Sequence, residues 1–286
     1  MTLSRPQDMI GEEDEIIFSL PKIYYELQAA LSDPDKTFQD LGEIISFDPA
    51  LTARLLKIVN SPFYGFPSEI ETISHAISII GMDQLTDLSL ATLVIYQFRG
   101  IPNNLFNMEK FWRHSMACGV VARSIAEFRG EKNVERFYLA GILHDIGRLV
   151  IFSKEPALAR DAFFRSKEMK ENIYLSEREL MGFDHADVGR ELLKAWQLPP
   201  RLVEAVGCHH QPQTAKEFAV DAAIIHTSDY IVHVLRAGSD AEFSEPQLYP
   251  KSWEIIGLSP DDFEFMKDKV IQQYQGIVSL FFEGSL

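Results

Sequence analysis

The stretch Phe137–Phe152, FYLAGILHDIGRLVIF, decides the fold. If this stretch is helical, its apolar residues cover every side of the helix. We therefore expect a buried helix with Asn133 as its N-terminal cap. An adjacent histidine and aspartate, His144 and Asp145, interrupt this apolar stretch after its first half. A buried carboxylate is costly unless a cation compensates it. That cation is either a metal ion or Arg148, which lies one helical turn after Asp145.

Helical spacing continues on both sides of this stretch. Leu51, Leu55, Ile58 and Val59 repeat at intervals of three and four after the cap Asp48-Pro49. Caps such as Thr72 and Asp184, together with stop residues, predict further helices over 73–80, 83–98, 107–129, 185–197, 220–235 and about 260–282. Ser176 and Glu179 read as a capping box before Gly182. No strand alternation is evident, so the fold class predicted is all-α, with two packed lobes.

The loop 99–106, RGIPNNLF, is the predicted lobe boundary because it is rich in turn residues. It divides an N-terminal helical lobe, residues 1–102, from a metal-binding core over 103–240. A C-terminal helical extension, 241–286, follows the core.

Composition limits the functional classes. The 286 residues suffice for one large domain or two ordinary ones, and 46% hydrophobic with 24% charged residues is typical of soluble proteins. No apolar run approaches a membrane span, and the acidic N-terminus has no secretory apolar region. Two cysteines, Cys118 and Cys208, give no disulfide framework. We therefore expect a cytoplasmic protein with no membrane association.

The net charge of −15 disfavours nucleic acids as partners because it repels their phosphates. A small anionic ligand is not excluded by this charge, since a metal site supplies its own positive field.

Five of the eight histidines and two aspartates follow an order that can close into one pocket. The candidate metal ligands are His114, His144, Asp145, His185, His209, His210 and Asp229. Imidazoles and carboxylates without a thiolate suit iron, manganese, nickel or zinc. His226 and His233 share a helix face with Asp229 and are expected to be structural or to support the ligands. His75, in the N-terminal lobe, is expected to be structural.

Several segments together resemble the HD superfamily of metal-dependent phosphohydrolases, and more closely its HDOD family of bacterial signalling output domains. The resemblance covers about residues 17–215. Its segments are Leu20-Pro21, FDPALTARLLKIVNSPFYG (47–65), IETISHAISIIGMDQLTDL (70–88), LAGILHDIGRL (139–149) and HADVGRELLKAWQLPPRLVEAVGCHH (185–210). It implies an N-terminal helical lobe packed on an HD-type helical core, with a role in bacterial signal transduction that often lacks catalysis.

The retained ligand set is also similar to that of the HD-GYP phosphodiesterases, which cleave cyclic di-GMP. That similarity implies one ion held by His114, His144, Asp145 and Asp229. Asp145 would bridge to a second ion held by His185, His209 and His210. Two such ions about 3.5–4 Å apart can activate a bridging water. Asp145, which would bridge the ions, and Arg148 are the candidate catalytic residues.

Three departures from the HD-GYP pattern weaken the catalytic interpretation. Arg148 stands where those enzymes have a lysine, and arginine does not readily release a proton. Gln211–Thr214, QPQT, replaces the glycine-rich GYP segment. Lys110 occupies the position of an additional glutamate ligand, so a third metal is not expected.

Three hypotheses follow from the sequence. The first is a regulatory signalling module that retains the metal site, and the second is a metal-dependent phosphohydrolase acting on a nucleotide or cyclic nucleotide. The third is structural metal binding or metal or redox sensing. The predicted cofactor is one or two divalent transition-metal ions, with iron or manganese favoured over nickel or zinc. The predicted partner is a signalling protein or a small phosphorylated ligand.

Overall fold

Every regular element that the structure describes is helical, which confirms the all-α class. The structure is a computed structural model that describes residues 5–10, 19–98, 107–235 and 247–283. The predicted lobe boundary at 99–106 lies outside these residues. Within the described ranges no single helix is long and apolar enough to cross a membrane, and only a bent pair of consecutive helices meets that test together.

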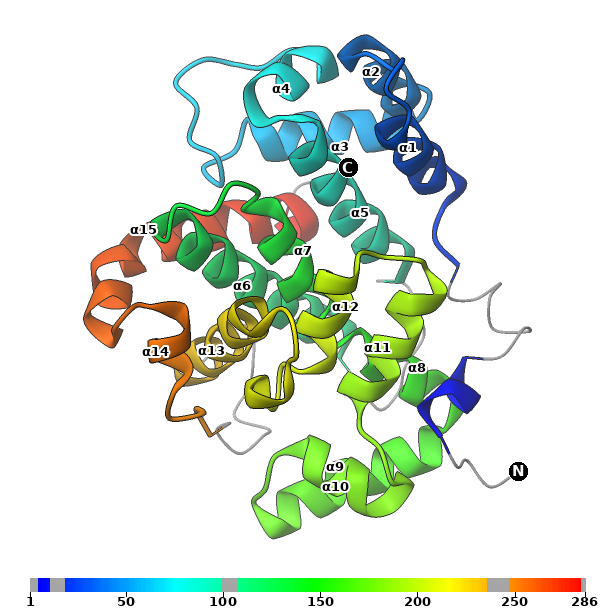
Figure 1. Cartoon of the computed structure of the whole chain (residues 1–286), viewed down its shortest axis with the longest axis vertical. Helices are drawn as coiled ribbons and strands as arrows, with labels where there is room; N and C mark the ends of the chain where they lie inside the picture. The colour runs from blue at the N-terminus through cyan, green and yellow to red at the C-terminus, as the bar shows by residue number, and fades with distance from the viewer. Residues whose placement is uncertain (1–4, 11–18, 99–106, 236–246, 284–286) are drawn as a thin grey trace.

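The N-terminal lobe consists of four short helices and one long helix that leads out of it (Figure 1). A short 3₁₀ turn, η1 (Pro6–Met9), precedes them. The helices are α1 (Lys22–Ser32), α2 (Phe38–Ser46), α3 (Pro49–Val59), α4 (Ile73–Ile80) and α5 (Met82–Phe98).

The second lobe contains the helices that carry the candidate ligands. They are α6 (Met108–Phe128), α7 (Glu135–Leu143), α8 (Ile146–Lys154), α11 (His185–Ala195), α12 (Pro200–Gly207) and α13 (Ala219–Leu235). A hairpin of α9 (Pro156–Met169) and α10 (Ile173–Met181) projects at one end of the molecule (Figure 1). The chain closes with η2 (Pro212–Thr214), α14 (Ser252–Ile256), α15 (Pro260–Val278) and the π-helical turn η3 (Ser279–Glu283).

Side-chain caps fix where several of these helices begin, as their sequences predict. Asp48 accepts from the amide of Leu51 at 2.9 Å, and Thr72 accepts from the amide of His75 at 3.1 Å. Asp184 accepts from the amide of Asp187 at 3.0 Å, directly before His185. That last cap places His185 in the first turn of α11.

Two local predictions are wrong. The predicted single helix over 137–152 is two helices, α7 and α8, which break at His144 and Asp145. Apolar periodicity cannot reveal such a break because both helices are buried and apolar. The predicted capping box at Ser176 is also wrong, because α10 already begins at Ile173. Ser176 is buried inside that helix and donates to the carboxylate of Glu171 at 2.7 Å.

A glycine allows α8 to approach α11 closely. A Cβ atom built on Gly147 would overlap the carbonyl oxygen of His185 and lie 2.6 Å from the amide nitrogen of Gly189. No side chain larger than hydrogen fits there without moving a helix backbone. Gly147 follows Asp145 by two residues, so this contact brings the Asp145 segment against the start of α11.

The N-terminal lobe attaches to a buried ion pair of the second lobe. Glu135, at the start of α7, is fully buried and accepts from Arg123 of α6 at 2.9 Å. Tyr64 reaches across from the N-terminal lobe and donates to Glu135 at 2.6 Å. The C-terminal helix α15 adds a second link, because Gln273 donates to the carbonyl of Phe63 at 2.8 Å. The N-terminal lobe is thereby fixed to the first turn of α7, the helix that ends directly before His144.

The contact at Gly147 predicts a large effect of one methyl group. We expect Gly147→Ala to lower the free energy of unfolding by about 3 kcal/mol, because the added Cβ overlaps backbone atoms. Chemical denaturation followed by circular dichroism measures this change. Gly189→Ala is the matched control on the same helix pair, since its Cβ would come no closer than 3.2 Å to the Val206 side chain and 3.6 Å to the amide nitrogen of Gly147. The free energy of unfolding of the control should stay within about 1 kcal/mol of the wild-type value. Equal effects of the two variants would contradict the close approach at Gly147.

Candidate metal centre

The seven predicted ligands come together in one buried cluster between helices. His114 lies within α6 and Asp229 within α13, while His185 opens α11. His144 and Asp145 occupy the break between α7 and α8, and His209 and His210 lie in the turn after α12. Helix breaks and helix ends thus supply five of the seven side chains. Such positions leave both the backbone and the side chain free to turn into the pocket.

Asp145 is the central carboxylate of this cluster. Its Oδ2 accepts from Arg148 at 3.0 Å, while its Oδ1 lies 3.0 Å from the Nε2 of His185. The Nε2 atoms of His144 and His209 lie 3.7 and 3.9 Å from the same Oδ1. Although Asp145 precedes α8, its side chain does not cap that helix. One oxygen is therefore held by Arg148 and the other is presented to three imidazoles.

The charges around Asp145 keep it ionised. Burial alone would raise the pKa of this carboxyl, but His144, Arg148 and His185 outweigh burial and hold its pKa well below the usual range. The structure thus contains the Arg148 pairing that the sequence offers as the alternative to a metal. It also leaves the other oxygen of Asp145 among the imidazoles. Arg148 orients Asp145 in this arrangement.

Two imidazoles are oriented as metal ligands by backbone carbonyls. The Nδ1 of His144 donates to the carbonyl of Gly141, and the Nδ1 of His209 donates to that of Val206, both at 2.7 Å. Both rings are fully buried, and their Nε2 atoms have no hydrogen-bond partner among the described residues. Because each proton is on Nδ1, each Nε2 offers a lone pair to the pocket. Burial also lowers the pKa of His209 to about 3, so this ring stays neutral.

A carboxylate that the sequence did not single out supports His185. Glu177 of α10 is buried and contacts the Nδ1 of His185 at 2.6 Å, and it also accepts from the His185 amide at 2.9 Å. On its opposite side, the Nε2 of His185 lies 2.7 Å from the Nε2 of His210. A carboxylate that holds the outer nitrogen of an imidazole is a common support of metal-bound histidines. No local sequence signal marks Glu177, because only the tertiary contact between α10 and α11 reveals it.

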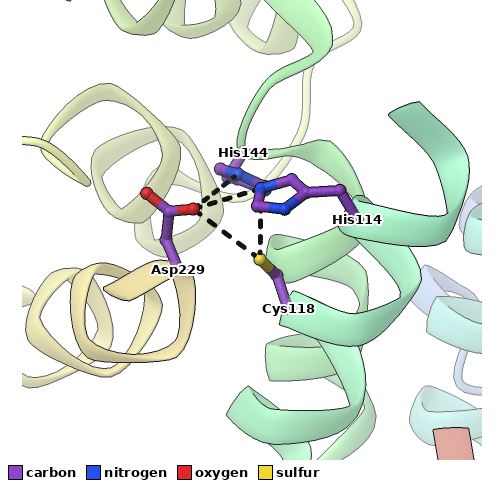
Figure 2. Close-up of side chains that lie close together, drawn as sticks. All are labelled: His114, Cys118, His144 and Asp229. Carbon is purple, nitrogen blue, oxygen red and sulfur yellow. Dashed lines mark hydrogen bonds and ion pairs between the residues drawn. The ribbon is translucent and has the colours of Figure 1, made fainter. Parts of the chain in front are cut away.

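His114 and Asp229 form the other end of the cluster, together with Cys118 (Figure 2). The Nε2 of His114 lies 3.1 Å from the Oδ1 of Asp229, and the Nε2 of His144 lies 3.8 Å from that oxygen. The Sγ of Cys118 lies 3.5 Å from the Nε2 of His114. The sequence interpretation missed this thiol, although Cys118 follows His114 by one helical turn and so faces the same side of α6.

The remaining histidines support the cluster or lie apart from it. His233 contacts the Oδ1 of Asp229 at 3.0 Å, and this charge raises the pKa of His233 to about 9 against the effect of burial. His226 uses both ring nitrogens, since Nδ1 lies 2.7 Å from the carbonyl of His209 and Nε2 accepts from the amide of Tyr249. His226 therefore holds the backbone of a candidate ligand. His75 is exposed on α4, in the other lobe.

The donor set fits divalent metal ions. Three overlapping groups have ligand atoms within 4.8 Å of one another: His114, Cys118, His144 and Asp229; His144, Asp145 and His209; and His185, His209 and His210. Buried nitrogen and oxygen donors with fixed tautomers are what transition metals require from a protein. In this grouping, Cys118 joins the predicted ligands at the end of the cluster that contains His114.

Comparison with known proteins identifies the family. The HDOD domain profile matches residues 17–212, and the chain belongs to the HDOD family. An uncharacterized protein of Treponema pallidum (strain Nichols) is 26% identical over 211 residues, which are 73% of this chain and 40% of that protein. The chain therefore corresponds to less than half of that curated relative.

Solved structures share the fold. An HDOD domain protein of unknown function from Geobacter sulfurreducens aligns with a TM-score of 0.77 at 24% identity, covering 92% of this chain and 93% of that one. A protein of Shewanella amazonensis SB2B, provisionally named a metal-dependent phosphohydrolase, aligns at 0.66 and 22% identity, covering 96% and 98%. A provisionally named signal transduction protein of Marinobacter aquaeolei VT8 aligns at 0.74 and 17%, covering 96% and 65%.

The charge state of His185 predicts how metal binding depends on pH. Burial lowers the pKa of His185, but Glu177 and Asp145 outweigh burial and raise it to about 10 in the metal-free protein. A metal ion must displace that proton from Nε2, so binding should release at least one proton. Apparent affinity should then rise about tenfold per pH unit between about pH 6.5 and 8.5.

Isothermal titration calorimetry in buffers of different ionisation enthalpy counts the released protons. Glu177→Gln removes the charge that raises the pKa of His185, so this variant should release fewer protons and bind about tenfold more weakly. An affinity that does not change with pH in the wild-type protein would contradict the arrangement around His185.

Proposed function

We propose that this chain is a regulatory HDOD protein of bacterial signal transduction that holds one or two divalent transition-metal ions in the buried cluster. The observation that carries the proposal is the pair of buried Nε2 atoms of His144 and His209. Their tautomers are fixed by backbone carbonyls, and neither has a hydrogen-bond partner among the described residues. Leaving two such acceptors buried is costly unless a cation uses them. Iron or manganese is favoured by the imidazoles and carboxylates around Asp145, with nickel or zinc as alternatives.

A regulatory role is supported by the way the cluster connects to the N-terminal lobe. Helix α7 carries Glu135 at its first turn and ends at Leu143, directly before His144. Glu135 is bonded to Tyr64 of the other lobe, so a change in the position of α7 alters a contact between lobes. A metal ion that draws His144 toward the cluster acts on the same rigid helix. The occupant of the site would thus be sensed at the surface of the N-terminal lobe, where a signalling protein could bind in the cytoplasm.

A second candidate function is phosphohydrolysis, which one pocket favours. A pocket of about 410 Å³ reaches His210 and is lined by Arg178, Arg190 and Lys216. These cations would attract a phosphorylated ligand to the edge of the metal cluster. Arg178 and Arg190 are already paired with Asp184 and Asp187, which reduces the positive field available to a ligand. In this reaction the metal ions would activate water and neutralise the phosphoryl group. Residues of the chain would orient the water and the phosphoryl group.

Metal content tests the proposal directly. Untagged protein purified without chelator, or reconstituted with manganese or iron, should contain one or two ions per chain by mass spectrometry. Asp145→Asn should bind these ions about 100-fold more weakly, because the amide does not supply the anionic oxygen. His75→Gln is the control, since His75 is exposed in the other lobe. Wild-type protein that binds no metal after reconstitution would rule out a metal-dependent function.

Turnover separates the two functions. Metal-loaded protein should hydrolyse neither nucleotides nor cyclic dinucleotides above background if the role is regulatory. Turnover that Asp145→Asn abolishes while the variant stays folded would establish the phosphohydrolase instead.

A further inference from the structure

We propose that Cys118 is a metal ligand, and that His114, Cys118, His144 and Asp229 form a four-ligand site with a thiolate. The inference rests on the proposed metal function, and it changes the division of ligands between two ions. The arrangement implied by the HD-GYP enzymes gives the first ion to His114, His144, Asp145 and Asp229. In this chain Cys118 takes the position of Asp145 in that set.

The distances between the four donors match a tetrahedral site. Zinc-like ions bind nitrogen at about 2.0–2.1 Å and sulfur at about 2.3 Å, so tetrahedral ligand atoms lie about 3.3–3.6 Å apart. The Sγ of Cys118 lies 3.5 Å from the Nε2 of His114 and 3.9 Å from the Oδ1 of Asp229. The Oδ1 of Asp229 lies 3.1 Å from the His114 nitrogen and 3.8 Å from that of His144. The Nε2 of His144 lies within 4.8 Å of the Cys118 Sγ and of the His114 nitrogen, so adjustments of up to about 1 Å close these four atoms around one ion.

All four side chains point toward one another across a shared space (Figure 2). Cys118 and His144 are fully buried, and His114 and Asp229 are 7% and 6% exposed. The Nε2 of His144 has no hydrogen-bond partner among the described residues, so the space already contains a donor atom that needs a cation. A thiol that served only packing would not require a carboxylate and two imidazole nitrogens around its sulfur.

The remaining donors form a second group without His144. Asp145 Oδ1 lies 3.0 Å from the Nε2 of His185, which lies 2.7 Å from the Nε2 of His210, and His209 faces the same oxygen at 3.9 Å. One Nε2 atom can bind only one ion. If His144 completes the thiolate site, Asp145, His185, His209 and His210 hold the second ion. Asp145 then belongs to one ion and does not bridge two.

This division has a functional consequence. A site with four protein ligands, one of them a thiolate, is closed in the manner of structural zinc sites, whereas catalytic sites keep a position open. The thiolate also shifts the preference of this half of the cluster toward zinc and other softer ions. The chain would then carry one closed ion beside one ion that is accessible through His210.

Cobalt is a sensitive probe for the thiolate. Titration of the metal-free 286-residue chain with Co²⁺ should produce a near-ultraviolet sulfur-to-cobalt charge-transfer band. Cys118→Ala should lose this band and bind the ion about 100-fold more weakly. Cys208→Ala is the matched control, because Cys208 is also buried but contacts Arg190 outside the cluster. It should keep the band.

The outcomes separate this inference from the proposed function. Cobalt bound without the band, and with equal affinity in Cys118→Ala, would overturn the thiolate ligand and leave the metal site standing. No cobalt bound to the wild type would overturn both. Should Cys118→Ala fail to fold, X-ray absorption of the wild-type cobalt protein decides. One sulfur neighbour at about 2.3 Å supports the inference, and a shell of nitrogen and oxygen alone contradicts it.

Discussion

A negative charge buried in an apolar helical core is the constraint on which the site depends. Asp145 is 4% exposed and sits between two apolar helices. An isolated carboxylate there would cost several kcal/mol, so the fold must surround it with positive or proton-donating groups. Arg148 satisfies one oxygen, and three imidazoles gather around the other. The break between α7 and α8, the contact at Gly147 and the support by Glu177 all serve this arrangement.

The same constraint explains why the neighbouring histidines are so rigidly held. Carbonyls of Gly141 and Val206 hold the outer nitrogens of His144 and His209, and Glu177 holds that of His185. Each of these contacts orients an Nε2 atom toward the centre before any ion arrives. The site is therefore preorganised, and the cost of ordering it is met when the protein folds.

The sequence predicts the fold class and most helices because amphipathic spacing and caps are local signals. Asp48, Thr72 and Asp184 cap where expected, and the family assignment over residues 17–212 is confirmed. The helix break at His144 and Asp145 was missed because burial on all sides removes the periodicity that would show it. The spacing of Ser176 and Glu179 fits a capping box, although α10 already begins at Ile173.

The candidate site was only partly predictable for the same reason. The order of residues along the chain predicts seven candidate ligands, and the structure places all seven in one cluster. Glu177 and Cys118 are not predicted from the sequence because their roles arise from contacts between helices. The cysteine count bears only on disulfides, although Cys118 follows His114 by one helical turn and so shares its face of the helix. What a spacing cannot give is the orientation of each imidazole, and that orientation decides which atoms face the pocket.

The most direct test of the account is an anomalous difference map from crystals of the protein grown with manganese or iron. The account predicts an anomalous peak at the metal absorption edge within about 2.0–2.3 Å of the His209 Nε2 and the Asp145 Oδ1. A map without such a peak, in which Asp145 contacts only Arg148 and His185, would contradict it.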